Sequence, residues 1–155
     1  DTYFVVGHFH YVMFGGTGFA FIAALYYWFP KIYGRMYNVK RANLAFWIMF
    51  IGFNLLYFPM LVVGIMGMPR RYFDYLPEFH VPNIISTVGS WVLITGLIIM
   101  ILNFIQGARK GEKASKNPWG GLTLEWTVDS PPTLENFDEV PTVTGGPYDY
   151  HKKEA

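Results

Sequence analysis

Three long stretches of this chain contain no charged side chain, and they constrain the fold more than any other feature. Asp, Glu, Lys and Arg are absent from residues 2–30, 42–69 and 81–108, which are 29, 28 and 28 residues long. About 20 predominantly apolar residues are enough for a helix to cross a bilayer. Such a segment must satisfy its backbone hydrogen bonds without water, as a helix does. The sequence therefore predicts an all-α integral membrane protein with three transmembrane helices. We expect the spans near residues 2–28, 43–66 and 84–105.

The composition excludes several other classes of protein. Only 15% of the residues are charged, against about 25% in ordinary soluble domains. A net charge of +1 without a dense basic stripe argues against nucleic acid as a partner and leaves membrane lipid. Because the chain has no cysteine, disulfides, thiolate metal sites and iron–sulfur clusters are excluded.

The positive charges between the spans predict the topology. The first connection carries Lys31, Arg35, Lys40 and Arg41 and no acid, and Arg109 and Lys110 follow the third apolar run. By the positive-inside rule both regions lie on the cytoplasmic side. We therefore expect a membrane domain over residues 1–106. Residues 107–155, polar and rich in Pro and Gly, are expected to form an extended, irregular tail on that side, lying on partner surfaces.

The start of the chain carries no sign of a signal peptide. No basic segment precedes the first apolar run, and that run is too long for one. Asp1 stands directly at the mouth of the first span, which is what we expect of one piece of a longer or split polypeptide.

Two histidines near the start of the first span are the main candidates for chemistry. If this span is a helix, each residue turns by about 100°, so His8 and His10 leave its axis roughly 200° apart. They then cannot share one metal ion, but each can bind a different centre on its own side. A strand would place both on one face, but an isolated strand cannot satisfy its backbone in lipid.

Three roles for His8 and His10 stay open on residue chemistry alone: metal or haem ligation, a proton relay, and bracing of the helix bundle. Ionisable groups inside a membrane are costly and therefore usually functional. Imidazole is a common axial ligand of haem iron. His80 and His151 fall in the outer loop and the tail, where we expect solvated surface.

The outer loop contains adjacent arginines, Arg70 and Arg71, although such loops are normally poor in Lys and Arg. One interpretation is that Asp74 and Glu78 simply neutralise them. The other is that the two guanidiniums hold carboxylates or phosphates of a ligand, since the planar fork of Arg binds such groups bidentately.

Several motifs resemble one family. The segment DTYFVVGHFHYV at residues 1–12 resembles helix ten of subunit I of the haem–copper oxidases, specifically of bacterial cytochrome c oxidase. GMPRRY at residues 67–72 is similar to the loop between helices eleven and twelve of that subunit. NPW, LEW, SPP and ENF between residues 117 and 137 are similar to its C-terminal tail. The resemblance covers the whole chain and implies the last three helices of a twelve-helix subunit.

The resemblance assigns roles to the matched residues. His8 would be the proximal ligand of the high-spin haem, and His10 one of two axial ligands of the low-spin haem, with Phe9 between the two. Arg70 and Arg71 would hold haem propionates. The cofactors would be two A-type haems, and the complex would also contain copper, not liganded by this chain.

Asp1 would help to bind magnesium or manganese. In the family a histidine precedes this position and ligates the same ion, so half of that site is missing here. The second axial ligand, the copper histidines and the cross-linked tyrosine lie on earlier helices of the family.

The resemblance also implies an activity. Together with the rest of subunit I and with subunits II and III, the chain would reduce oxygen to water with electrons from cytochrome c and translocate protons, most simply across a bacterial plasma membrane. A quinol oxidase of the same superfamily is the nearest alternative, and Tyr11 and Pro69 favour the cytochrome c branch. A non-catalytic membrane subunit with structural histidines, or a piece of a proton-coupled transporter, is the competitor from another class.

Overall fold

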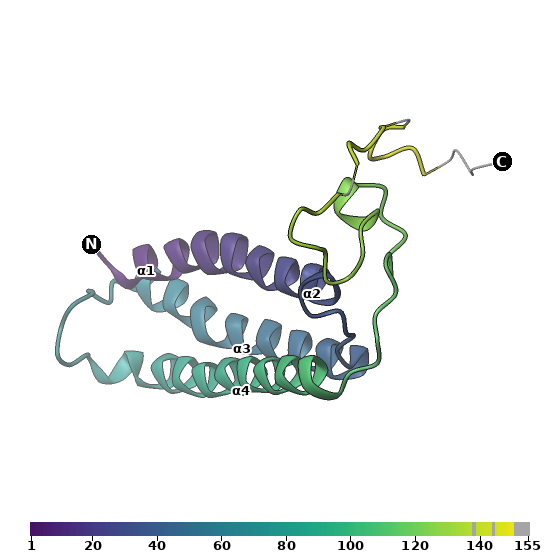
Figure 1. Cartoon of the computed structure of the whole chain (residues 1–155). Helices are drawn as coiled ribbons and strands as arrows, with labels where there is room; N and C mark the ends of the chain where they lie inside the picture. The colour runs from purple at the N-terminus through teal and green to yellow at the C-terminus, as the bar shows by residue number, and fades with distance from the viewer. Residues whose placement is uncertain (138, 144, 151–155) are drawn as a thin grey trace. The chain divides into compact units, whose positions relative to one another are not determined.

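A computed structural model contains three long helical segments (Figure 1), and it describes residues 1–137, 139–143 and 145–150. All three segments are long and apolar enough to cross a membrane, and the described part of the chain forms no strand, so the predicted fold class is confirmed. The elements in chain order are α1 (Tyr3–His10), the π-helix η1 (Tyr11–Gly18), α2 (Phe19–Tyr33), α3 (Val39–Ile65), the 3₁₀ turn η2 (Pro77–Phe79), α4 (His80–Lys110) and the 3₁₀ turn η3 (Leu124–Trp126).

Each helical segment extends past its expected span at one end or at both ends. They cover Tyr3–Tyr33, Val39–Ile65 and Pro77–Lys110. An apolar run reports the thickness of the bilayer, whereas a helix continues for as long as its backbone hydrogen bonds do. Lys31 therefore lies inside α2 instead of in the first connection, and His80 begins α4 instead of lying in the outer loop.

The chain divides into two compact units, of which the first contains residues 1–23 and 39–103. In this unit α3 packs against both α1 and α4 (Figure 1). Glycines set the two close approaches: a Cβ at Gly64 would overlap the backbone of Phe4, and one at Gly52 would overlap the backbone of Leu93. Close contact through small residues is the usual way in which helices associate in lipid, where burial of apolar surface provides no driving force.

The first span changes its helical geometry directly after the histidines. From Tyr11 to Gly18 it is a π-helix, whereas the sequence predicts an ordinary helix throughout. The wider turns of a π-helix are rare and often occur at functional sites. Three glycines, Gly15, Gly16 and Gly18, make this segment easier to distort than the helices around it.

The second unit contains residues 24–38 and 104–155, of which 138, 144 and 151–155 lie outside the described residues, His151 among them. Its tail lies on the chain's own segment 24–38, a contact that the sequence did not predict. Backbone hydrogen bonds join Met36 N to Glu112 O (2.8 Å) and Ala114 N to Gly34 O (2.9 Å). Further along, the indole N–H of Trp119 donates to the carbonyl of Tyr27 (2.8 Å).

Candidate functional site

The N-terminus of the chain is held against the loop between α3 and α4. Thr2 caps α1, because its hydroxyl accepts the N–H of Phe4 (3.3 Å). Tyr3 N donates to Met68 O at 3.0 Å, and the Asp1 carboxylate pairs with Nε of Arg70. These contacts fix the start of α1 relative to the loop after α3. They therefore also fix the positions of His8 and His10 along the helix axis.

The structure places His8 and His10 on the α-helix that the geometric argument requires. Two residues apart on α1, they lie on nearly opposite sides of it. The His8 ring is exposed and stacks loosely on Phe4 one turn earlier, with ring centroids 6.2 Å apart. Among the described residues no group hydrogen-bonds His8, so both of its ring nitrogens are open to a ligand.

The hydrogen bond of His10 defines its tautomer. Its Nδ1 lies 2.8 Å from the carbonyl oxygen of Val6, one turn back on the same helix. A carbonyl oxygen only accepts, so Nδ1 carries the proton and the lone pair of the neutral imidazole is on Nε2. A histidine that ligates a metal usually has this arrangement, with the other ring nitrogen donating to a backbone carbonyl.

Two aromatic rings contact the His10 imidazole. The neighbouring Phe9 ring lies 4.1 Å away between centroids, tilted by 51°. Tyr57 of α3 stacks on the imidazole at 4.4 Å with only 14° between the planes. Sequence reasoning missed Tyr57, because only the packing of α1 on α3 brings it to the histidine.

The paired arginines have different surroundings. Arg70 is bound to Asp1, so the structure brings together two of the residues that the sequence singled out. Arg71 is exposed and adopts a left-handed backbone conformation with φ of 67°. In the part of the chain that is described, neither Asp74 nor Glu78 pairs with either arginine, and Asp74 accepts the N–H of Tyr75 instead (2.8 Å). The neutralisation hypothesis therefore has no support in these contacts.

The described residues contain no group of three or more His, Cys, Asp or Glu side chains that could hold a metal ion. Asp1 is the acid that the resemblance assigns to a metal ion. Its side chain is 72% exposed despite the pair with Arg70, so the carboxylate can still accept a second ligand. The chemistry of these donors fits one carboxylate supplied to a hard cation and one neutral imidazole supplied on each side of α1.

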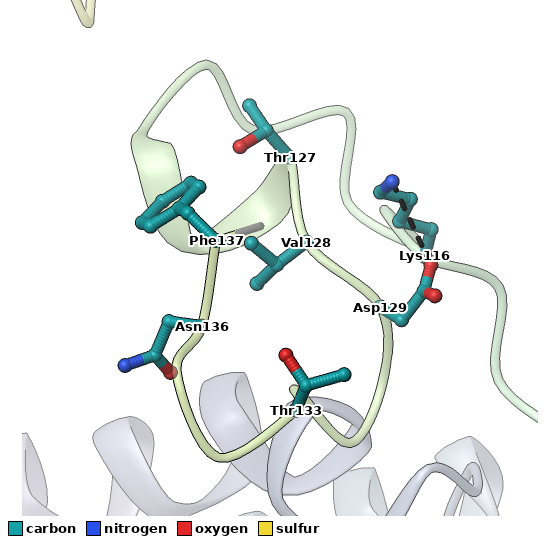
Figure 2. A pocket seen from close by; sticks show the side chains of 7 residues that line it. All are labelled: Lys116, Thr127, Val128, Asp129, Thr133, Asn136 and Phe137. Carbon is teal, nitrogen blue, oxygen red and sulfur yellow. Dashed lines mark ion pairs between the residues drawn. The ribbon is translucent and has the colours of Figure 1, made fainter. Parts of the chain in front are cut away.

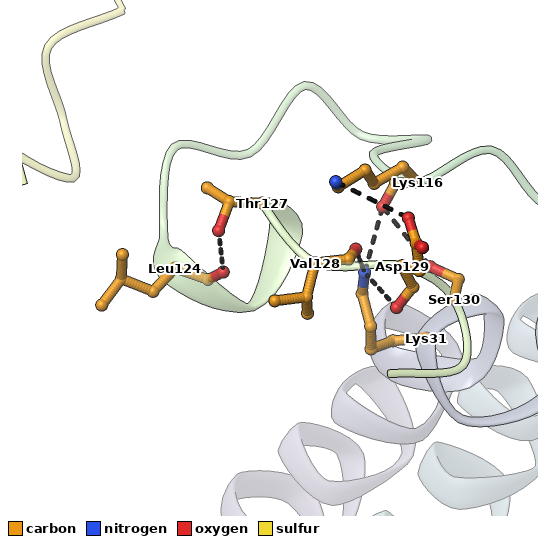
Figure 3. Close-up of polar contacts among 7 residues, drawn as sticks. All are labelled: Lys31, Lys116, Leu124, Thr127, Val128, Asp129 and Ser130. Atoms are coloured by element: carbon orange, nitrogen blue, oxygen red, sulfur yellow. Dashed lines mark hydrogen bonds and ion pairs between the residues drawn. The ribbon is translucent and has the colours of Figure 1, made fainter. Parts of the chain in front are cut away.

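A second charged cluster surrounds Lys31, which is only 6% exposed (Figure 3). Its ammonium group donates to the carbonyls of Val128 (2.8 Å), Lys116 (3.1 Å) and Asp129 (3.4 Å). The same ammonium lies 5.0 Å from the centre of the Trp126 ring, a cation–π contact. From the sequence, Lys31 was only one of the positive charges that predict the membrane topology. Its role here depends on contacts with residues about 90 positions away, which no local pattern reveals.

A small pocket of about 180 Å³ lies in the loop that this cluster holds (Figure 2). It is lined by Lys116, Thr127, Val128, Asp129, Thr133, Asn136 and Phe137. None of the residues predicted to carry function lines this pocket.

Comparison with known proteins connects these features to one family. The family model described as cytochrome c and quinol oxidase polypeptide I matches residues 1–92. The chain is 51% identical over 150 residues to cytochrome c oxidase subunit 1 of Synechocystis sp., a match that covers 97% of this chain and 27% of that protein.

Two further relatives give similar matches. Identity is 43% to cytochrome c oxidase subunit 1 of Bacillus subtilis, covering 94% of this chain and 24% of that protein. It is also 43% to heme-copper oxidase subunit I+III of Aeropyrum pernix, covering 92% and 17%. The chain thus spans about a quarter or less of the length of these relatives.

The Lys31 cluster predicts that this side chain anchors the tail. In Lys31→Met the three carbonyls lose their charged donor, and one such hydrogen bond is worth about 1.5–3 kcal/mol. Loss of even one at the lower limit raises the undocked population about tenfold. We expect at least that increase in the rate at which a glutamate-specific protease cleaves after Glu125 in the membrane-embedded protein. Lys40→Met, which removes an exposed lysine of α3, is the control and should leave the rate of cleavage unchanged.

The pKa of Glu125 predicts a pH dependence of the same docking. Burial by itself raises this pKa. Hydrogen bonds from the Thr123 hydroxyl, its own backbone and Trp28, together with the charge of Lys31, lower the pKa by more, so that it lies below its usual value. A lowered pKa means that the ionised form stabilises the docked tail, and that this contribution is lost as pH falls through the docked-state pKa. Cleavage after Thr123 or Trp126 by a protease active in acid should accelerate as pH is lowered. The same acceleration in Glu125→Gln would contradict the assignment.

Proposed function

The chain belongs to the family of cytochrome c and quinol oxidase polypeptide I, and we propose on this basis that it forms the C-terminal three-helix part of the catalytic subunit of a cytochrome c oxidase. The complete enzyme would reduce oxygen to water with electrons from cytochrome c and couple this reaction to proton translocation. The cytochrome c branch is favoured over the quinol branch, because the relatives described above as subunit 1 are cytochrome c oxidases.

One observation carries the proposal: His8 and His10 stand on opposite sides of one helix, and His10 presents an Nε2 lone pair. His8 would be the proximal ligand of the high-spin haem and His10 an axial ligand of the low-spin haem. When bound, the haems supply the iron centres that carry electrons and bind oxygen. The protein's own contribution is to hold the two imidazoles at a fixed separation on opposite sides of α1, with Phe9 between them.

The contacts at the outer end of the first span support a second part of the proposal. Arg71 has no ion-pair partner among the described residues, and Arg70 has only Asp1, so both guanidiniums can bind haem propionates. Asp1 would give its remaining lone pairs to magnesium or manganese, the rest of that site coming from outside this chain. An oxygen ligand of this kind suits a hard cation.

The surroundings of the chain follow from the same assignment. It is an integral membrane protein, and we propose the bacterial plasma membrane, with the Lys- and Arg-rich connection and the tail on the cytoplasmic side. Its partners would be the remainder of subunit I, which carries the copper ligands, and subunits II and III. The haems would be of the A type.

Substitution of the two histidines tests the proposal in the intact complex. In reduced-minus-oxidised visible spectra, wild type should show two haem populations, of which only one binds carbon monoxide. His8→Ala should remove the population that binds carbon monoxide, and His10→Ala the other, because each imidazole serves a different iron.

His80→Ala is the matched control, since this histidine begins α4 and contacts Tyr75. It should leave both haem populations intact. A wild-type complex without haem absorbance would contradict the oxidase assignment and leave the bracing or proton-relay hypotheses. Identical spectra in wild type and in both His8→Ala and His10→Ala would contradict the ligand assignment.

A further inference from the structure

The stacking of Tyr57 on His10 joins two different helices. His10 is the last residue of α1, and Tyr57 lies inside α3. Their ring centroids are 4.4 Å apart and their planes differ by 14°, so the phenol ring covers one face of the imidazole almost in parallel. The hydrogen bond to Val6 holds the Nδ1 edge of the same imidazole (2.8 Å). One contact thus fixes an edge of the ring, and the other fixes its plane.

The position of Tyr57 is itself determined by the packing of α1 on α3. Tyr57, Leu61 and Gly64 follow one another at intervals of four and three residues, which places them on one face of α3. Along this face, a Cβ at Gly7 would lie 2.9 Å from the Leu61 side chain, and one at Gly64 would overlap the backbone of Phe4. The two helices are therefore in close contact at Phe4 and Gly7, on the turns that precede His10.

Neighbouring rings hold Tyr57 from the side as well. It is only 9% exposed, and the Phe53 ring meets it edge-on at 5.2 Å. Directly after His10, Tyr11 donates a hydrogen bond to the side chain of Asn54 (2.9 Å), a second link between the first span and α3. The ring that faces His10 is therefore held in place on several sides.

We propose that Tyr57 is a positioning residue that fixes the rotational orientation of the His10 imidazole plane. The inference rests on the proposed function, in which Nε2 of His10 ligates the low-spin haem. The orientation of an axial imidazole plane determines how its π orbitals overlap with the iron d orbitals. Groups that orient such ligands therefore tune the metal centre without touching it.

The ring of Tyr57, and not its hydroxyl, carries this role. Within the described part of the chain the hydroxyl has no hydrogen-bond partner, whereas the ring makes the stacked contact. Tyr57→Phe should therefore behave as wild type. Tyr57→Leu removes the parallel surface and leaves the imidazole with its bond to Val6 and the tilted contact with Phe9.

The test is electron paramagnetic resonance of the ferric low-spin haem in the intact oxidase complex. We expect the wild-type g values in Tyr57→Phe. In Tyr57→Leu we expect a shifted and broadened low-field signal, because the imidazole then adopts a range of orientations, while the haem content stays that of wild type. Phe46→Leu is the matched control: it makes the same kind of change on α3, at a residue whose ring contacts are with Phe19, Trp47 and Phe50 and not with Tyr57 or His10, and should keep the wild-type signal.

Other results would overturn the inference. Wild-type g values in Tyr57→Leu would show that the stack does not set the orientation. An equal shift in Phe46→Leu would assign the effect to general loosening of the helix packing, and an equal shift in Tyr57→Phe would assign it to the hydroxyl.

If Tyr57→Leu does not assemble, Tyr57→Met, which fills the volume with a flexible side chain, answers the same question. A wild-type complex without a low-spin haem signal would overturn the proposed function together with this inference, whereas a normal wild-type signal that Tyr57→Leu leaves unchanged overturns the inference alone.

Discussion

The need to satisfy backbone hydrogen bonds without water determines the rest of this structure. Across the lipid the first span has to be helical. That single requirement separates His8 from His10, which a strand would have placed on the same face. A two-residue spacing that would otherwise favour chelation of one ion therefore presents two imidazoles on opposite sides of a helix, with Phe9 between them in the sequence. The chemistry of the segment follows from the solvent around it as much as from its residues.

Packing between α1 and α3 then surrounds His10 with side chains from a second helix. Small residues let the two backbones approach closely at Gly7 and Gly64, and this approach brings Tyr57 against His10. At the N-terminal end of α1, the pairing of Asp1 with Arg70 connects the beginning of this helix to the loop after α3. The histidine segment is thus fixed at its start, along its side and, through Tyr11 and Asn54, at the residue that follows His10.

The sequence was informative where physics is local. Charge-free runs predicted the three helices, and the spacing of His8 and His10 predicted their opposite orientation, because both depend only on neighbouring residues. It did not predict the anchoring role of Lys31, the stack on His10 or the partner of Arg70, since each depends on contacts between residues far apart in the chain. The π-helical turns of η1 were also missed, because a run of apolar residues and glycines is compatible with either helical geometry.

The central claim is that each histidine serves its own iron. Replacement of each histidine by glycine, followed by addition of free imidazole, tests this claim most directly in the intact complex. The account predicts that imidazole restores only the carbon monoxide-binding haem in His8→Gly and only the six-coordinate haem in His10→Gly. Loss or recovery of both haems together in either variant would contradict it, because the two imidazoles would then act on a common centre.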